Sequence, residues 1–134
     1  MTENELKTRT KKFALRILKV VDALPNTRAA NIIGNQLGRA GTSVGANYRA
    51  VCRSRSSAEM ISKLSVVEEE ADESCFWMEL AAEHGVMPAK KLAPLHKEAG
   101  ELVAIMVSSR KTLLRKTKLA RQRPIENRES KIEN

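Results

Sequence analysis

The feature that most constrains the fold of this 134-residue chain is an apolar row, with alternating spacings of three and four residues, that occurs in four separate segments. Such a row stays on one face of an α-helix and forms the packing surface of a helical bundle. The rows run through residues 6–24, 33–51, 60–81 and 92–113. The first of them consists of Leu6, Thr10, Phe13, Ile17, Val20 and Leu24. The sequence therefore predicts an all-α fold built from four long helices.

Residues at the edges of each row indicate where the helices begin and end. Thr2 and Ser56 each stand three residues before a glutamate, which is the pattern of a capping box at a helix start. Pro25 stops the first row, Gly85 suits the left-handed residue that ends a helix, and Pro88 fits the first turn of the next one. We therefore expect helices over residues 3–24, 27–53, 57–84 and 88–118.

The short connections between these helices favour an antiparallel up-down-up-down four-helix bundle, which we expect to span residues 1–119. Residues 120–134 have no apolar row and a high charge density, so we expect a disordered tail there. Four aromatic residues, four prolines and six glycines are too few for a β-sandwich or barrel. Because no apolar run is long enough to span a bilayer and the first residues do not resemble a signal peptide, we expect a cytoplasmic protein without a membrane partner.

The second expected helix contains an unusual set of glycines. Gly34, Gly38, Gly41 and Gly45 lie within a narrow arc beside the apolar row. Each glycine in a helix interior costs about 1 kcal/mol relative to alanine, so we expect compensation from a neighbouring backbone packed unusually close; the alternative is a broken helix or a loop. Asn47 occupies a position in the row itself, where a buried amide would fix the register of the helices.

Charge is segregated along the chain, whose net charge is +8. Residues 7–19, 28–55 and 108–124 contain lysine and arginine but no acid, whereas residues 56–85 contain one lysine and eight acids. The acidic segment either neutralises a basic one or leaves the basic surfaces free for phosphates, whose neutralisation drives sequence-independent binding of nucleic acid. We expect contacts with RNA or DNA from Arg28, Arg39, Arg49, Arg53, Arg110, Lys111, Arg115, Lys116 and Lys118.

The third expected helix has a second apolar face, formed by Val66, Phe76, Trp77 and Leu80, away from its apolar row. A monomeric bundle buries only one stripe of each helix, so this second face favours an interface between subunits of a homo-oligomer. In the alternative interpretation, the two aromatic rings are partly exposed or fold over a neighbouring side chain.

No group of residues predicts an enzyme. His84 and His96 have no serine or cysteine partner nearby in the sequence, and Ala81 and Ala93 stand where a di-iron bundle would need glutamates. The acidic run over residues 68–73 points in several directions on a helix and favours a solvated or salt-bridged face over a cation site. We therefore expect no catalytic residue, no metal site and no cofactor.

Five residues of the second expected helix, together with segments of the third, form a recognisable pattern. They are Leu37, Ala40, Ser43, Val44 and Asn47, followed by an Arg-Ser run at residues 53–57, an acidic run at 70–73 and the pair Phe76-Trp77. In this pattern the chain resembles a family of four-helix-bundle proteins encoded in intervening sequences of bacterial large-subunit rRNA genes. The resemblance covers about residues 7–118, with Ala50 at a position where members commonly carry an acid.

The resemblance implies a four-helix bundle that assembles as a ring-like homopentamer. It also implies similarity to the accessory protein of diversity-generating retroelements, a basic pentamer that works with a reverse transcriptase and nucleic acid. Together with the charge pattern, it predicts a non-enzymatic, self-associating bundle that binds RNA or DNA. The alternatives are a scaffold or adaptor for a partner protein such as a reverse transcriptase, without direct nucleic-acid binding, and an enzyme with an unrecognised pocket.

Overall fold

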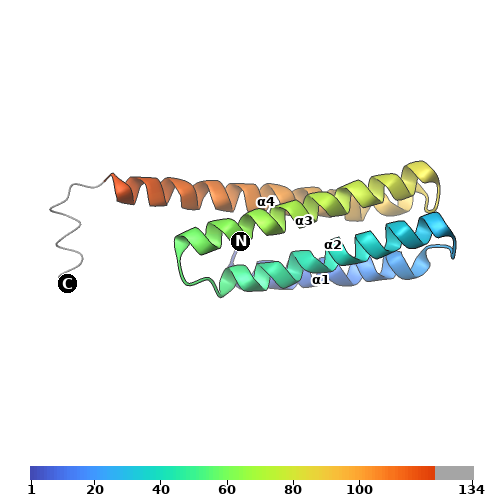
Figure 1. Ribbon diagram of the computed structural model, residues 1–134, viewed down its shortest axis with the longest axis horizontal. Coiled ribbons are helices and arrows are strands. Elements are labelled where there is room, and N and C mark those ends of the chain that lie inside the picture. The colour runs from blue at the N-terminus through green and yellow to red at the C-terminus, as the bar shows by residue number, and fades with distance from the viewer. Residues whose placement is uncertain (123–134) are drawn as a thin grey trace.

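The computed structural model describes residues 1–122 and forms four antiparallel helices joined by short loops (Figure 1). The helices are α1 (Glu3–Ala23), α2 (Arg28–Cys52), α3 (Ser57–His84) and α4 (Ala89–Arg121). The prediction of an all-α, up-down-up-down four-helix bundle is confirmed. Helix α4 continues three residues beyond its expected end, and the expected tail lies, from residue 123 on, outside the described residues.

Local side-chain contacts explain why α1 and α3 begin where the sequence predicts. The hydroxyl of Thr2 accepts a hydrogen bond from the backbone N–H of Glu5 at 3.1 Å, and the Glu5 carboxylate accepts one from the N–H of Thr2 at 3.0 Å, which completes a capping box. At the start of α3 the Ser56 hydroxyl accepts from the N–H of Glu59 at 3.1 Å. The Glu59 carboxylate accepts from the N–H of Arg55 instead, so this second box is only half formed.

The remaining helix ends also follow local chemistry. Thr27 caps α2 by accepting a hydrogen bond from the N–H of Ala30 at 3.1 Å. Gly85 ends α3 with a φ of 83°, a left-handed conformation that glycine adopts without a steric cost. Pro88 is the residue before α4 rather than part of its first turn, which moves the start of this helix one position along the chain.

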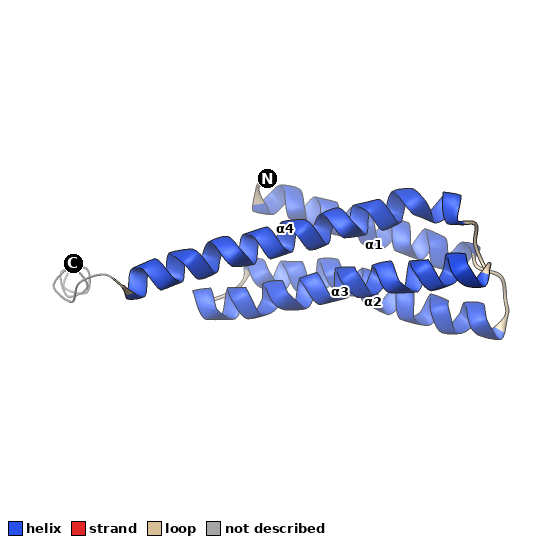
Figure 2. Ribbon diagram, turned by 90° about the horizontal axis from the view of Figure 1, so that it is seen from above, coloured by secondary structure: helices blue, strands red, loops and turns tan. Residues whose placement is uncertain are grey.

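The four helices form a square in cross-section, in which each helix lies beside the next one in the sequence and α4 returns beside α1 (Figures 1 and 2). One continuous core fills the centre, and the α1–α4 side is the least extensive of the four contacts. The largest fully buried side chains are Phe13, Ile17, Leu37, Val44, Val67, Met78, Leu102 and Met106. Within the described residues, no helix is long and apolar enough to cross a membrane.

The glycines of α2 allow α1 to pack unusually close. An ideal Cβ at Gly41 would lie 2.5 Å from Cγ1 of Ile17, and one at Gly45 would lie 3.2 Å from the carbonyl oxygen of Thr10. A methyl group does not fit at Gly41 without moving a helix, and Gly45 faces the α1 backbone directly. Since α2 is a continuous helix, the broken helix is excluded. The close neighbouring backbone expected from the sequence occurs at Gly45, whereas Gly34, Gly38 and Gly41 face side chains of α1.

Candidate nucleic-acid interface

The net positive charge of residues 1–122 is concentrated in one half of the bundle. Residues 1–12, 43–70 and 106–122 make up the half that contains the starts of α1 and α3 and the ends of α2 and α4; we call it the terminal half (Figure 1). It contains fourteen lysines and arginines and six acids, whereas the distal half, residues 13–42 and 71–105, contains seven of each. The net charge of the described residues therefore lies in the terminal half, which is the end of the bundle that attracts a polyanion.

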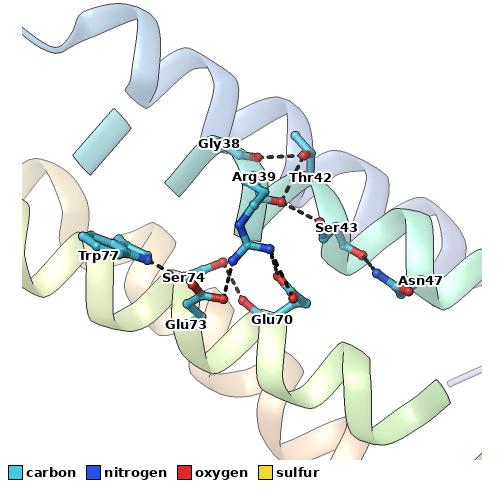
Figure 3. Close-up of polar contacts among 9 residues, drawn as sticks. All are labelled: Gly38, Arg39, Thr42, Ser43, Asn47, Glu70, Glu73, Ser74 and Trp77. Atoms are coloured by element: carbon cyan, nitrogen blue, oxygen red, sulfur yellow. Dashed lines mark hydrogen bonds and ion pairs between the residues drawn. The ribbon is translucent and has the colours of Figure 1, made fainter. Parts of the chain in front are cut away.

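Arg39, one of the expected nucleic-acid contacts, is paired with acids of α3 (Figure 3). Its Nη2 lies 2.5 Å from Oε2 of Glu73, and its Nη1 lies 3.2 Å from Oε2 of Glu70. The hydrogen bond from Arg39 holds the pKa of the Glu73 carboxyl below its ordinary value, and a hydrogen bond from Nε1 of Trp77 at 3.3 Å acts in the same direction. The acidic segment therefore neutralises Arg39 of the basic stretch over residues 28–55, as one of the two sequence interpretations anticipated.

The polar side chains of α2 beside Arg39 bond to their own helix (Figure 3). The hydroxyl of Thr42 donates to the carbonyl of Gly38 at 2.7 Å, and the Ser43 hydroxyl donates to the carbonyl of Arg39 at 2.6 Å. The amide Nδ2 of Asn47, which is half-buried, donates to the carbonyl of Ser43 at 2.8 Å. This amide nitrogen therefore bonds within α2, and its hydrogen bond does not fix the register between helices.

Two further arginines form ion pairs between helices. Arg110 of α4, also an expected contact, donates from Nη2 and Nε to Oε1 of Glu68 at 3.0 and 3.2 Å, with both side chains about three-quarters buried. Arg9 of α1 bridges to α4, with its Nη2 2.6 Å from Oε1 of Glu98 and 2.9 Å from Oε2 of Glu101. These arginines tie the bundle together, and a phosphate would have to displace a carboxylate to reach either of them.

A groove between α1 and α2 brings together cations that the structure does not pair. It has a volume of about 500 Å³. Its lining residues are Lys7, Thr8, Lys11, Ala14, Thr42, Gly45, Ala46, Arg49 and Arg53. Within residues 1–122 neither Arg49 nor Arg53 has an ion-pair partner, and both are exposed. We call this set the basic groove; it joins two expected arginines to two α1 lysines that the sequence did not single out.

A second depression borders the basic groove on its α3 side. Arg49 and Arg53 line it as well, together with Lys63 and one acid, Glu59. Glu59 is already engaged, because its carboxylate lies 3.8 Å from Nζ of Lys63 and accepts the N–H of Arg55. The cationic surface therefore continues from α1 across the end of α2 to the start of α3.

The other expected nucleic-acid contacts lie at the two extremes of the molecule. Lys111, Arg115, Lys116 and Lys118 are exposed on the last turns of α4, which project beyond the other helices at the terminal end (Figures 1 and 2). Arg28 is exposed at the start of α2, in the distal half. The structure thus gathers most of the expected contacts at one end and leaves Arg28 and Arg39 in the distal half.

The expected interface residues of α3 are divided between the surface and the core. Phe76 is 51% exposed and meets the ring of Trp77 edge-on, with the ring centroids 5.1 Å apart. Trp77 and Leu80 are half-buried and pack against the core, and together with Ile32 of α2, which is 61% exposed, they line a depression of about 400 Å³. We call Ile32, Phe76, Trp77 and Leu80 the α2–α3 apolar patch; Val66, 36% exposed, lies further along α3 toward its start.

The positions of the two histidines and of the buried Cys75 thiol do not form a recognisable catalytic or metal site in residues 1–122. Nε2 of His96 lies 2.7 Å from Oε2 of Glu79 between α4 and α3, and His84 is exposed at the end of α3. Cys75 is buried, which raises the pKa of its thiol to about 11 and keeps it protonated near neutral pH. In residues 1–122 no three histidine, cysteine or acidic side chains group together as metal ligands.

The fold and this charge distribution define a small four-helix bundle with a strongly basic end. The model of the 23S rRNA-intervening sequence protein family matches residues 2–108, so the chain belongs to that family, as its sequence motif predicted. The chain is similar in structure to a protein with unknown function from the S23 ribosomal protein family of Bacteroides thetaiotaomicron. The TM-score is 0.77 at 29% sequence identity, over 83% of this chain and 99% of that one. No curated protein matches the chain at a significant level.

Proposed function

We propose that the protein binds the phosphate backbone of RNA or DNA with the terminal half of its bundle. The observation that carries this proposal is the basic groove, where Lys7 and Lys11 of α1 face the same space as Arg49 and Arg53 of α2 and no carboxylate lines the wall. Lysine and arginine that neutralise phosphates release counterions, which favours binding without regard to sequence. The exposed cations on the projecting end of α4 lie in the same half of the bundle.

The contrast between paired and unpaired arginines supports an assignment of the binding to particular residues. At Arg39 and Arg110 an incoming phosphate would have to replace Glu73 and Glu68, which are already held at hydrogen-bond distance. At Arg49 and Arg53 a phosphate displaces only water and mobile ions. The proposal therefore assigns the groove arginines to nucleic acid and the paired arginines to the stability of the bundle.

Fluorescence anisotropy with a labelled, mixed-sequence single strand tests this assignment. The variant Arg49→Ala/Arg53→Ala is compared with Arg28→Ala/Arg39→Ala, which removes the same charge from the same helix. For single strands the logarithm of the binding constant falls with the logarithm of salt concentration by about 0.7 for each phosphate contact, so loss of two contacts should flatten the slope by roughly 1.4. An equal loss of affinity in both variants would contradict the proposal.

We also propose that the α2–α3 apolar patch mediates self-association, in a homopentamer by the family resemblance. The patch supports this because Ile32 and Phe76 expose large apolar side chains beside the half-buried Trp77. Repetition of the basic groove in a ring would strengthen a weak phosphate contact, since later contacts become intramolecular.

Light scattering tests this part separately. Phe76→Glu should lower the mass of the assembly with little loss of helicity, whereas Leu114→Glu, at a 43% exposed position on the projecting end of α4, should leave it unchanged. A monomeric wild-type protein at micromolar concentration would contradict self-association. A protein that assembles but binds no nucleic acid at low salt would instead support the adaptor or scaffold function toward a partner protein.

A further inference from the structure

The residues that line the basic groove are cationic, hydroxyl-bearing or small. Four of its nine residues are lysine or arginine, two are threonine, and the rest are Ala14, Ala46 and Gly45. The lining has no aromatic ring on which a base could stack and no amide or carboxylate that could read a base edge or a ribose hydroxyl. Every charged side chain in the groove is a hydrogen-bond donor, so the complementary ligand is an acceptor-rich anion.

The cations are spaced along the groove rather than gathered at a point. Lys7 and Lys11 are separated by one helical turn of α1, and Arg49 and Arg53 by one turn of α2, which is about 6 Å of rise in each case. Because α1 and α2 run antiparallel side by side, these two rows line one common groove. Such an arrangement fits several linked anionic groups better than a single one.

A buried glycine between the two helices allows the lysines of α1 and the arginines of α2 to lie close together. Gly45 is buried, and a Cβ there would approach the Thr10 carbonyl oxygen to 3.2 Å and the backbone nitrogen of Lys11 to 3.5 Å. A side chain at this position would push α1 away from α2 and separate the lysines from the arginines. The volume of about 500 Å³ lies within the range of sites for small ligands.

We infer that the basic groove is a site for a short chain of linked phosphates, which it recognises without contacting base or sugar. This inference rests on the proposed phosphate-backbone binding and specifies what the groove recognises. The same chemistry occurs in a nucleic-acid backbone and in free polyphosphate, and the groove accepts both. A base-free strand and an inorganic chain are therefore sufficient ligands.

Isothermal titration with sodium tripolyphosphate, without divalent cations, tests the groove directly. We expect saturable binding to wild-type protein and at least tenfold weaker binding of orthophosphate. Arg49→Ala/Arg53→Ala should weaken tripolyphosphate binding at least tenfold, and the charge-matched control Lys90→Ala/Lys91→Ala, at exposed positions of α4 in the distal half, less than threefold. Absence of tripolyphosphate binding, or an equal loss in both variants, overturns the inference.

A second arm compares an abasic phosphodiester strand with an ordinary single strand of the same length. We expect affinities within threefold of each other; an abasic strand that binds tenfold more weakly overturns recognition by phosphate alone. If the ordinary strand depends on Arg49 and Arg53 but tripolyphosphate does not bind, the proposed function stands and this inference fails. If tripolyphosphate binds in the groove but no nucleic acid binds at low salt, the groove is a site for linked phosphates only as a free chain, and the proposed function fails.

Discussion

Replacement of Gly41 by alanine tests whether the close approach of α1 and α2 depends on the missing side chain. The new Cβ would lie 2.5, 2.7 and 2.9 Å from three carbons of Ile17, namely Cγ1, Cγ2 and Cβ. Ordinary contacts between carbon atoms are about 3.5–4.0 Å, so each of the three would overlap by roughly 1 Å. A rotamer change of Ile17 cannot relieve the overlap with its own Cβ, and Ile17 is fully buried. The two helices therefore have to separate.

The expected loss of stability follows from two opposing contributions. Overpacking of a core costs about 1–3 kcal/mol, and three overlapping carbons favour the upper end of that range. In the opposite direction, the higher helix propensity of alanine stabilises the folded protein by about 1 kcal/mol relative to glycine. The net effect is a decrease of about 2 kcal/mol in the free energy of unfolding, or roughly 8 °C in melting temperature for a domain of this size. Urea unfolding followed by circular dichroism, at one fixed protein concentration, measures it.

Gly100→Ala is the matched control for this measurement. Gly100 lies within α4, is exposed, and would place its Cβ with no heavy atom within 4 Å. We expect this variant to gain about 0.5–1 kcal/mol, because only helix propensity and the entropy of the unfolded chain change. If Gly41→Ala proves as stable as Gly100→Ala, the close approach of α1 to α2 does not depend on the glycines of α2.

Two further predictions follow from the ion pairs and the buried thiol. The hydrogen bond from Arg9 holds the pKa of the Glu98 carboxyl below its ordinary value, so the carboxylate stabilises the folded protein at neutral pH and this contribution is lost as the pH falls through the lowered pKa. Glu98→Gln should therefore lower the free energy of unfolding at neutral pH, and its difference from wild type should shrink in urea titrations as the pH falls through the lowered pKa of Glu98. Cys75, with a raised pKa and a buried sulfur, should resist alkylation in the folded protein and react after unfolding, as peptide mass mapping would show.

The fold was predictable because its signals are local. A capping hydroxyl at Thr2, a left-handed glycine at position 85 and the apolar rows each act within one helix or one turn, so the sequence contains them directly. The glycine arc predicted a close neighbour for α2 by the same kind of argument. The identity of that neighbour, the α1 backbone at Thr10 and the side chain of Ile17, depends on how the helices pack.

The functional surface was predictable only in part because it depends on contacts between helices. Arg39 and Arg49 look equivalent on the polar face of α2, yet one lies opposite the acids of α3 and the other faces the basic groove. Lys7 and Lys11 belong to a basic stretch that the sequence shows, but their proximity to Arg49 follows from the antiparallel register of α1 and α2. Gly45 is the signal that could have identified these two lysines, once the register of α1 and α2 is known.

Lysine footprinting tests the central claim, that phosphates bind at the basic end of the bundle, most directly. Acetylation of each lysine is measured by mass spectrometry with and without a saturating single strand. Lys7 and Lys11 in the groove should be modified several-fold more slowly in the complex, whereas the exposed distal lysines Lys90, Lys91 and Lys97 should react at unchanged rates. Equal protection of both sets, or protection confined to the distal lysines, would contradict the account.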